Sequence, residues 1–510
     1  MSLPSPLWTT KTSEVRMTGT WRSAVPDYRT APSPCHGACP VNGQIAIWIQ
    51  QIKNDDHQGA WLTLVENNPF PAIAGRICHH PCETVCNRLQ LDETVGICDL
   101  ERFIGDKALT ENWQYPAPVS NTEKSIAIIG SGPAGLSAAY QLGRKGYRVE
   151  LYESKNQLGG LMRYGIPAYR LEKSILDGEI QRIINLGVEV HLESEINSKE
   201  ALQKLRDQHD AIFLATGATL SKTLPNLDYN QPWVVDSADF LAATNAGKSC
   251  ELGERLLVIG GGSAAMDVAR TARRLGKKVT VLALEPESLL PAQRAEVDEA
   301  IEEGIEFITA AMMQSTTITD AGLNISCIRI DFEQGAKRGE FKVEPIRGSE
   351  FAIVVDGIIP SIGQDVDLAL WSGLLERAGT VLKTDAQWQT TMSGVFAGGD
   401  VATMDRFVTE AIGIGKQAAQ AIVNYLNPEQ AAIEIVKSKE VPFSVINTYY
   451  HPLVKKHLAA NTAVEMRLNN FDEVQQPLGF KEAMEESRRC FSCGNCTECD
   501  SCFFHCPDMA

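Results

Sequence analysis

The chain has 510 residues, 44% of them hydrophobic, which is enough for several domains with their own cores. Its formal net charge of −17 argues against a nucleic-acid or anionic-membrane partner. No apolar run reaches the length of a transmembrane helix, and the first residues lack the hydrophobic core of a secretion signal. We therefore expect a cytoplasmic protein without membrane insertion.

The 14 cysteines gather near the two ends of the sequence. Six lie in residues 35–98 and six in residues 490–506, while Cys250 and Cys327 stand alone between the two groups. A secreted protein held by disulfides would spread its cysteines over the whole chain, so two separate clusters predict metal sites instead. Cys250 and Cys327 are expected to be ordinary buried cysteines, and a disulfide-reductase mechanism is not expected.

Residues 1–121 are predicted to form a helical domain that binds iron and sulfide. A helical stretch is expected at residues 45–66, and Cys78, Cys82 and Cys86 would share one face of a helix because they are spaced four apart. Iron–sulfur clusters need three or four thiolates converging on an apolar site, whereas three nearby histidines keep zinc as an alternative. The candidate metal ligands of this domain are Cys35, Cys39, Cys78, Cys82, Cys86, Cys98 and Glu101.

The segment SIAIIGSGPAGLSAAYQLGRKGYRVELYES, residues 125–154, has the pattern of a dinucleotide-binding βαβ unit. A buried strand leads into a glycine turn, a helix, and a second strand that ends at Glu153. Gly130 makes the tight turn, Gly132 lets the backbone approach a pyrophosphate, and Gly135 lets helix and strand pack closely. The helix N-terminus faces the phosphate charge, and Glu153 can accept hydrogen bonds from ribose hydroxyls.

A second unit of this kind, RLLVIGGGSAAMDVARTARRLGKKVTVLALE, covers residues 255–285. Its turn contains Gly260 and Gly262, alanine takes the third glycine position at Ala265, and Glu285 ends the second strand. Two such units predict two dinucleotide sites.

Three small-residue segments complete the predicted cofactor sites. The glycine-rich loop at residues 158–167 is suited to closing over a flat cofactor. A buried strand at residues 211–215 ends in a small-residue turn, and another strand runs into a GGD turn at residues 394–400. The candidate cofactor-binding residues are Gly130, Gly132, Pro133, Ala134, Gly135, Glu153, Gly159, Gly160, Leu161, Thr216, Gly217, Gly260, Gly262, Ser263, Ala264, Ala265, Glu285, Gly363, Gly399 and Asp400.

The last cysteines follow the pattern C-x2-C-x2-C-x2-C-x2-C-x3-C-P. The final four reproduce the run found in bacterial ferredoxins, in which three thiolates bind one cluster and the fourth binds another. We expect one complete cluster here. It would use Cys496, Cys499 and Cys502 together with Cys490, Cys493 or Cys506.

With these motifs the chain resembles the glutamate synthase small-subunit family of flavin- and iron–sulfur-containing oxidoreductases, which is similar to the N-terminal half of dihydropyrimidine dehydrogenase. The resemblance covers about residues 30–430 and implies an α/β fold with two Rossmann-like domains, one inserted in the other. The implied domains are a helical iron–sulfur domain (1–121), an FAD domain (122–225 and 360–430), an NAD domain (226–359) and a C-terminal extension with the ferredoxin-like cysteine motif (431–510).

The resemblance also implies roles for the two fingerprints. The first, with Glu153, would bind FAD, the loop at residues 158–160 would cover the flavin, and Asp400 would hold the ribitol. The second would bind NAD(P)H. Family members that use NADPH carry two arginines where this chain has Leu284 and Glu285. A carboxylate repels the 2′-phosphate and suits a free 2′-hydroxyl, so NADH is predicted.

The N-terminal domain of the family holds two clusters, but its early C-x-x-C pair has no counterpart here. The family's wiring implies one cluster on Cys39, Cys78 and Cys82 with a fourth ligand near Glu101, beside Cys98. The second cluster would keep only Cys35 and Cys86. We therefore expect at least one [4Fe–4S] cluster in the N-terminal domain and one in the C-terminal tail.

The expected function is electron transfer without a catalytic acid–base pair. NADH would exchange a hydride with FAD, and the clusters would relay single electrons to a partner subunit or a ferredoxin. The tail and the segment TGTWR at residues 18–22 resemble parts of electron-transfer subunits, which suggests a 2-oxoacid:NAD oxidoreductase complex. The alternatives are a glutamate synthase small subunit that uses NADPH and, in another class, a non-catalytic scaffold whose cysteines bind zinc.

Overall fold

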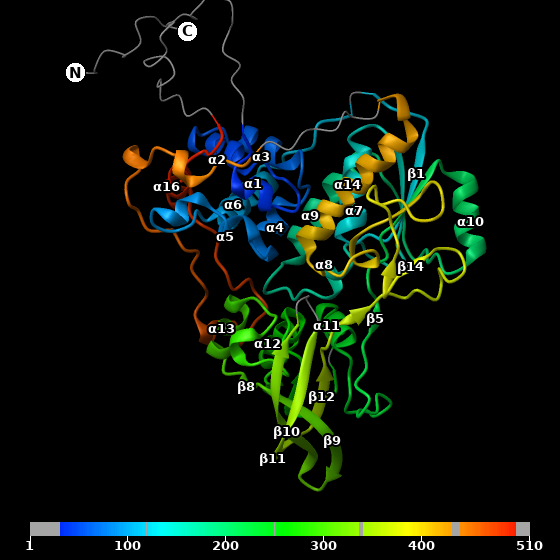
Figure 1. Cartoon of the computed structure of the whole chain (residues 1–510), viewed down its shortest axis with the longest axis vertical. Helices are drawn as coiled ribbons and strands as arrows, with labels where there is room; N and C mark the ends of the chain where they lie inside the picture. Colours follow the sequence, from blue (N-terminus) through cyan, green and yellow to red (C-terminus); the bar gives the residue numbers. More distant parts are fainter. Residues whose placement is uncertain (1–30, 119, 249, 336–339, 431–438, 496–510) are drawn as a thin grey trace, which may run out of the picture.

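The computed structural model describes residues 31–118, 120–248, 250–335, 340–430 and 439–495. Figure 1 shows a helical domain next to a first parallel-sheet domain, with a second parallel-sheet domain below them. This mixed α/β architecture confirms the predicted fold class. Within the described residues, no helix is both long and apolar enough to cross a membrane.

The N-terminal domain consists of short helices packed around large apolar side chains. Trp48, Trp61 and Phe70 are each at most 1% exposed. The helices at residues 71–77 and 97–110 cross closely at Gly75. A Cβ at this position would lie only 2.4 Å from the backbone nitrogen of Arg102, so glycine is needed for the close approach. The elements are α1 (Pro34–Ala38), α2 (Ile45–Lys53), α3 (His57–Val65), α4 (Pro71–Ile77), α5 (Pro81–Thr84), η2 (Asn87–Gln90) and α6 (Ile97–Thr110).

The helical stretch predicted at residues 45–66 consists of two helices, because the chain breaks between α2 and α3. Asp55 adopts a left-handed conformation with φ +63°, which aspartate tolerates better than most residues. Asp56 then caps α3 by accepting a hydrogen bond from the backbone N–H of Gly59 at 2.9 Å. Local side-chain capping at Asp56 therefore divides the helical stretch into two helices.

Cys78, Cys82 and Cys86 do not share one helix face, contrary to the prediction. Cys78 is the extended residue that ends α4, and His80 takes a left-handed φ of +55° before Pro81 starts α5. Cys82 lies in α5 and Cys86 follows it. The break turns Cys82 and Cys86 toward different cavities, as described below.

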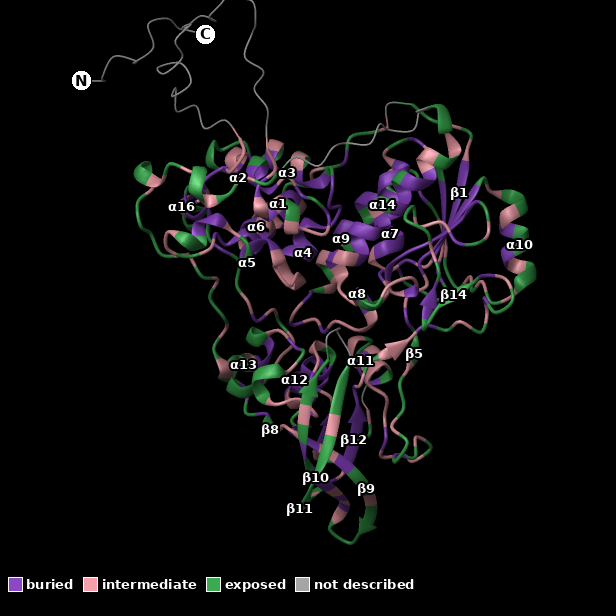
Figure 2. Ribbon diagram, in the orientation of Figure 1, coloured by how far each residue is buried: buried purple, intermediate pink, exposed green. Residues whose placement is uncertain are grey.

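The first parallel-sheet domain has the strand order β16-β4-β1-β2-β3, with every pairing parallel. Figure 2 shows β1 at the buried centre of this sheet, and β4 and β16 are buried along their whole length as well. Helices α7, α9 and α14 lie together beside the N-terminal domain (Figure 1). The elements are β1 (Ser125–Ile129), α7 (Pro133–Gly143), β2 (Arg148–Tyr152), α8 (Leu161–Tyr164), α9 (Lys173–Ile184), β3 (Glu189–His191), α10 (Lys199–Gln208), β4 (Ala211–Leu214), β14 (Arg377–Ala378), β15 (Val381–Leu382), β16 (Val395–Ala397), η4 (Gly399–Val401), α14 (Val408–Leu426) and η5 (Pro428–Gln430).

The second parallel-sheet domain has the order β12-β6-β7-β8 and carries an antiparallel sheet of order β11-β10-β9. The chain leaves the first sheet after β4 and returns to it only at β16, so the second domain is inserted as predicted. Strands β5 and β13 pair where the chain passes between the domains. The elements are β5 (Leu220–Ser221), α11 (Ser237–Asn245), β6 (Arg255–Ile259), α12 (Ser263–Arg274), β7 (Lys278–Leu282), η3 (Glu287–Leu289), α13 (Arg294–Glu302), β8 (Glu306–Ile308), β9 (Ala311–Thr319), β10 (Gly322–Gln334), β11 (Phe341–Val355), β12 (Gly357–Pro360) and β13 (Gln364–Asp365).

Residues 439–495 form a strap that touches both the helical domain and the inserted domain (Figure 1). Glu473 accepts hydrogen bonds from Arg76 at 2.5 Å and from Arg102 at 2.7 Å, and Arg467 pairs with Glu302 at 3.0 Å. The strap then returns to the helical domain, where α16 packs on α2 and α6. Its elements are η6 (Phe443–Val445), η7 (Thr448–Tyr450), α15 (Val464–Arg467) and α16 (Phe480–Arg488).

A buried ion cluster stabilises the inserted domain. The side chain of Glu303 is fully buried and accepts hydrogen bonds from Arg270 at 2.8 Å and from Arg274 at 2.7 Å. Burial alone would raise the pKa of Glu303, but the two arginines hold it below its usual value. The Arg274 guanidinium also lies 3.9 Å from the ring of Tyr169, which belongs to the first sheet domain.

Glu303→Gln is expected to lower the free energy of unfolding by about 3 kcal/mol, because it leaves two buried arginines without their shared carboxylate. Denaturant unfolding of the variant measures this loss. Glu306→Gln, at an exposed position on the next strand, is the matched control and should cost less than about 0.5 kcal/mol. Equal stability of the two variants would contradict the role assigned to Glu303.

Candidate functional site: nucleotide turns and two cysteine-lined cavities

The turn of the first βαβ unit is tightly packed on one side and open on the other. Gly130 has φ +103°, and a Cβ there would lie 2.4 Å from the carbonyl oxygen of Ala215. A Cβ at Gly135 would lie 1.9 Å from the carbonyl oxygen of Gly130, so α7 approaches the turn as closely as glycine allows. At Gly132, by contrast, no described atom outside its immediate chain neighbours lies within 4 Å of the Cβ position. The N-terminus of α7 therefore offers an open cradle of the kind a pyrophosphate occupies.

Glu153 lies at the end of β2, beside this turn. It is 7% exposed, and its carboxylate accepts hydrogen bonds from the backbone N–H of Ser131 at 3.0 Å and from the Ser131 hydroxyl at 2.5 Å. Its second oxygen accepts from the backbone N–H of Lys155 at 2.9 Å. These bonds fix the acid next to the glycine turn, where a ribose would lie.

The glycine-rich loop predicted to cover the flavin lies directly on the turn. Gly159 donates its backbone N–H to the carbonyl of Ser131 at 3.1 Å, and Gly160 has φ +52°. A Cβ at Gly160 would lie 2.8 Å from the Cα of Gly132, so the two backbones touch. Leu161 begins α8 and is 44% exposed.

Two further segments reach the same turn from across the sheet. A Cβ at Gly399 would lie 2.9 Å from the Cβ of Ala134, so η4 places Asp400 close to the start of α7. Thr216 and Gly217 follow β4, and Gly217 has φ +72° with no described atom within 4 Å of its Cβ position. Pro133 occupies the first turn of α7. The predicted flavin-binding residues therefore surround one open cradle, and they fit FAD.

The second βαβ unit repeats this geometry in the inserted domain. Gly260 has φ +138°, and its Cβ would lie 2.2 Å from the carbonyl oxygen of Ser361. Gly262 again has no described neighbour within 4 Å of its Cβ position. Ser263, Ala264 and Ala265 form the first turn of α12. The unit fits a second dinucleotide.

Glu285 lies beside this second turn. A carboxylate oxygen of Glu285 is 3.0 Å from the Cβ position of Gly261, and burial raises the pKa of Glu285 above its usual value. Gly363 follows Ser361, whose carbonyl approaches Gly260, by two residues. It lies between the two sheet domains, where its carbonyl accepts the backbone N–H of Lys222 at 3.0 Å.

The first cysteine-lined cavity, here called site A, contains Cys39, Cys78, Cys82 and Glu101 and has a volume of about 420 Å³ including its open mouth. The remaining walls are mainly apolar, with Ile45, Trp48 and Leu64 among them. Asn68 orients Glu101 by donating to its carboxylate at 2.7 Å. Three thiols and one carboxylate thus converge on an apolar space, as the family's wiring implies.

Burial dominates the electrostatics of site A, and the charge of the nearby Lys416 offsets it only in part at Cys39. Burial raises the pKa of Cys39 to about 11, of Cys78 to about 12 and of Glu101 to about 7. Iron ions would supply the positive charge that stabilises these groups as ligands. Cys98, predicted as a ligand, is not among the cavity walls, and its thiol donates to the carbonyl of Ala74 at 3.6 Å. Glu101, and not Cys98, therefore lines the cavity beside the three thiols.

The second cavity, here called site B, contains Cys35, Cys86, Cys490 and Cys493 and has a volume of about 360 Å³ including its mouth. Its other walls include Ile45, Ile49 and Phe491. From the sequence alone, Cys35 and Cys86 had no further cysteines to complete a ligand set, and Cys490 and Cys493 were grouped with the tail. The structure instead brings Cys490 and Cys493 to the N-terminal domain, across about 400 residues of chain. Cys496, Cys499, Cys502, Cys506 and the TGTWR segment lie outside the described residues.

The spacing of the thiols argues against zinc. Tetrahedral zinc with Zn–S bonds of about 2.3 Å would hold its sulfurs about 3.8 Å apart. Among the described residues, the only group of three or more possible ligand atoms within 4.8 Å of one another is Glu150, Glu189 and His191. In neither site, as far as the described residues go, do three possible ligand atoms lie within 4.8 Å of one another, which is wider than a single tetrahedral zinc ion requires.

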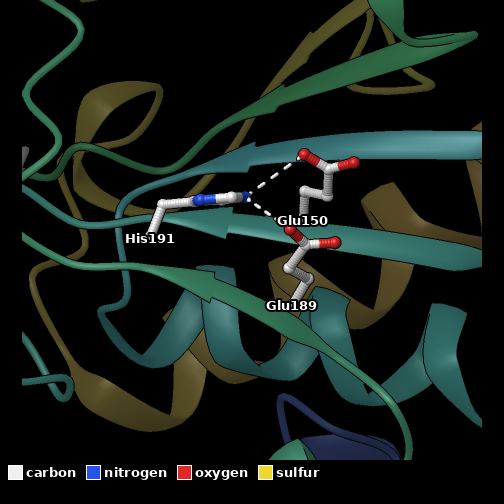
Figure 3. A group of neighbouring side chains, drawn as sticks. All are labelled: Glu150, Glu189 and His191. Atoms are coloured by element: carbon white, nitrogen blue, oxygen red, sulfur yellow. Dashed lines mark hydrogen bonds and ion pairs between the residues drawn. The ribbon is translucent and has the colours of Figure 1, made fainter.

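The group of Glu150, Glu189 and His191 lies on β2 and β3 (Figure 3), and none of the three lines either cavity. His191 approaches Glu150 at 3.2 Å and Glu189 at 3.5 Å. Glu150 also accepts hydrogen bonds from Arg148 at 2.6 Å and from the Tyr152 hydroxyl at 2.8 Å. These partners already satisfy Glu150, so we assign no metal to this group.

Helix α14 connects the flavin cradle to site A. It follows the turn that carries Asp400, and Thr409 in its first turn lies in the wall of site A, 3.8 Å from the sulfur of Cys78. Glu410 pairs with His79 at 3.1 Å, and the His79 ring stacks on Phe407 with centroids 4.1 Å apart. No local sequence pattern indicates Thr409, because its position in the cavity wall depends on how α14 packs against the cysteine loop.

Comparisons with known proteins agree with this arrangement. The family described as pyridine nucleotide-disulphide oxidoreductase matches residues 124–423, more than half of the chain. The domain described as dihydropyrimidine dehydrogenase domain II with a 4Fe-4S cluster matches residues 28–113. The structure of FprA from Mycobacterium tuberculosis in complex with NADPH shares the fold, with a TM-score of 0.52 over 72% of this chain and 100% of that one at 14% identity.

Curated relatives cover most of the chain. The NADP(+)-dependent formate dehydrogenase subunit beta of Moorella thermoacetica is 30% identical over 90% of this chain and 70% of its own length. The glutamate synthase [NADPH] small chain of Azospirillum brasilense is 32% identical over 78% and 87%. The NAD-dependent dihydropyrimidine dehydrogenase subunit PreT of Escherichia coli is 32% identical over 77% and 91%.

These matches confirm the resemblance inferred from the motifs and remove the zinc scaffold as an alternative. FAD and NAD(P) are the cofactors of the matched flavoprotein family, and a [4Fe–4S] cluster is that of the matched N-terminal domain. The chain belongs to the pyridine nucleotide-disulphide oxidoreductase family, among the FAD- and iron–sulfur-dependent NAD(P)H oxidoreductases that include the glutamate synthase small chain and PreT.

Proposed function

We propose that the chain is the NADH-linked electron-transfer subunit of a larger cytoplasmic redox complex. One observation supports this most strongly. Helix α14 runs from the turn beside the flavin cradle to the wall of site A, where Thr409 contacts the sulfur of Cys78. Bound FAD would supply the chemistry that links two-electron hydride exchange with a nicotinamide to one-electron transfer. Several relatives are themselves named as subunits, which supports a partner protein.

The chain's own residues bind, orient and insulate the cofactors. Gly132 and Gly262 open the two cradles for phosphates, and Glu153 fixes the position of the first ribose. Asn68 and Thr409 contact the metal ligands of site A, and hydrogen bonds near cluster ligands tune a cluster's reduction potential. The flavoprotein body has no C-x-x-C, since Cys250 and Cys327 stand alone in its sequence. A disulfide-reductase reaction is therefore not part of the proposal.

We propose NADH as the nucleotide because of Glu285. Its carboxylate lies beside the second glycine turn, where it would accept hydrogen bonds from a free ribose hydroxyl and repel a 2′-phosphate. The names of the relatives point both ways, to NADP(+) in the formate dehydrogenase and to NAD in PreT. A strong preference for NADPH would instead favour a role like that of the glutamate synthase small chain.

Glu285→Arg is expected to raise the ratio of kcat/KM for NADPH over NADH by about 10- to 100-fold, the gain of one charge-assisted hydrogen bond to phosphate. Anaerobic flavin reduction by each nucleotide measures the ratio. Glu287→Arg makes the same charge change two residues on, at an exposed side chain, and should leave the ratio unchanged. Equal ratios in both variants would contradict the role of Glu285.

The partner is proposed to be the catalytic part of a 2-oxoacid oxidoreductase or a ferredoxin. Purification of the tagged chain from its native source, followed by identification of stoichiometric companions, tests this proposal. A stable thiamine-dependent or ferredoxin-like companion supports it. Isolation of the chain with a glutamate synthase large subunit would overturn it in favour of that second function.

A further inference from the structure

We propose that site B binds a second [4Fe–4S] cluster, held by Cys35 and Cys86 from the N-terminal domain and by Cys490 and Cys493 from the end of the strap. The cluster would join two segments about 400 residues apart in sequence. Cys490-x2-Cys493 would take the place of the C-x-x-C pair that the sequence lacks ahead of Cys35. The inference rests on the iron–sulfur chemistry of the family and adds a ligand set that crosses the chain.

The two cavities divide neighbouring cysteines between them. Cys35 lies in the short helix α1 and Cys39 ends it, with the backbone N–H of Cys39 donating to the carbonyl of Cys35 at 3.2 Å. Cys35 lines site B, whereas Cys39 lines site A. Cys82 and Cys86 are divided in the same way by the break after α5. Each site thus receives one cysteine from each pair, and site B is filled to four by the strap.

The backbone around Cys490 and Cys493 has the shape of a thiolate-binding loop. Ser492 has φ +52°, an unusual conformation for serine, and its N–H donates to the sulfur of Cys490 at 3.4 Å. Asn87 donates to the sulfur of Cys493 at 3.5 Å, and Ser33 lies 3.1 Å from the sulfur of Cys35. Such hydrogen bonds stabilise thiolates and tune the potential of a bound cluster.

Buried polar contacts fix the strap against this cavity. Arg489 is 2% exposed, and it donates to the carboxylate of Glu486 at 2.6 Å and to the backbone carbonyl of Thr94 at 2.8 Å. Arg88, 1% exposed, donates to the carbonyl of Arg489 at 3.0 Å and lies 5.1 Å from the ring centroid of Phe491. The position of the two strap cysteines is therefore built into the fold.

Site B also extends the electron path. Ile45 lies in the walls of both cavities, so the two sites are separated by little more than one side chain. Site A faces α14 and the flavin cradle, while site B receives the strap just before the cysteine run of the tail. The proposed order is therefore flavin cradle, site A, site B and then the exit toward a partner.

Iron and acid-labile sulfide per bound FAD test the shared ligand set. Cys35→Ala and Cys490→Ala are each expected to lower both counts by about four, because each removes a ligand of the same cluster. The double variant is expected to lose no more than either single variant. Cys250→Ala, which replaces a cysteine outside both cavities, is the matched control and should keep the full count.

Iron and sulfide counts that differ from these expected values overturn the proposal. If Cys35→Ala loses no iron, site B is wrong, while a loss from Cys78→Ala would still uphold the iron–sulfur function. If the losses of Cys35→Ala and Cys490→Ala add, the two cysteines serve different clusters. Retained FAD shows that a variant has folded, and Cys493→Ala, at a less buried thiol, replaces Cys490→Ala if that variant loses its flavin.

Hydrogen exchange supplies a second readout. In Cys35→Ala, loss of the cluster is expected to speed amide exchange in residues 480–495, although these lie far from the substitution in sequence. Exchange in α7 should not change. Unaltered exchange in residues 480–495 would show that the strap docks without a shared cluster and would overturn the proposal.

Discussion

Cys78→Ala is expected to remove about four iron atoms per chain and to abolish cluster reduction by NADH, while reduction of the flavin continues. Cys78 lies in site A beside Thr409, the residue through which α14 reaches the cavity. Because the nucleotide cradles lie in other domains, the variant should bind FAD normally. Anaerobic NADH titration, with flavin absorbance and the cluster's electron paramagnetic resonance recorded together, separates the two steps.

Cys98→Ala is the matched control for this experiment. Cys98 is buried close to site A, but its thiol donates to the carbonyl of Ala74 and is absent from the cavity walls. The variant should keep its full iron content and its cluster signal. Loss of four irons from Cys98→Ala, with an intact cluster in Glu101→Ala, would mean that Cys98 rather than Glu101 is the fourth ligand.

Gly135→Ala is expected to reduce bound FAD from about one per chain to nearly none. The added methyl group would lie 1.9 Å from the carbonyl oxygen of Gly130, so α7 must move away from the turn that cradles the pyrophosphate. Flavin content after purification and thermal unfolding with added FAD measure the effect.

Gly143→Ala tests whether the effect is local. Gly143 lies in the same helix, and its Cβ would meet its nearest neighbour, the Cβ of Leu186, at an ordinary 3.4 Å. This variant should bind FAD fully and gain slightly in helix stability. If Gly135→Ala binds flavin as well as Gly143→Ala does, the close approach at Gly130 is not needed for the site.

Local sequence patterns were sufficient for the two nucleotide units. The strand, glycine turn, helix and acid lie within about 30 residues, so Gly130 and Glu153 could be placed together from spacing alone. The insertion of one domain in the other followed from the family resemblance, and the strand order confirms it. These features depend on short-range geometry that the sequence encodes directly.

The parts that the sequence missed depend on contacts between distant segments. Nothing near Cys490 indicates that Arg88 and Arg489 hold it against the N-terminal domain. Cys490 and Cys493 also continue the regular spacing of the tail, so the local pattern grouped them with the tail cysteines and did not indicate that they lie beside Cys35 and Cys86. The division of the helical stretch at Asp55 has a local cause, since Asp56 caps the second helix.

The most direct test of electron transfer through this chain is an anaerobic titration of the purified holoprotein with NADH. The flavin absorbance and the paramagnetic signal of reduced [4Fe–4S] clusters are followed in the same samples. Bleaching of the flavin together with growth of the cluster signal is the predicted result. A protein that binds no flavin, or whose clusters stay oxidised while the flavin is fully reduced, would contradict the proposed path from nucleotide to cysteine-bound iron.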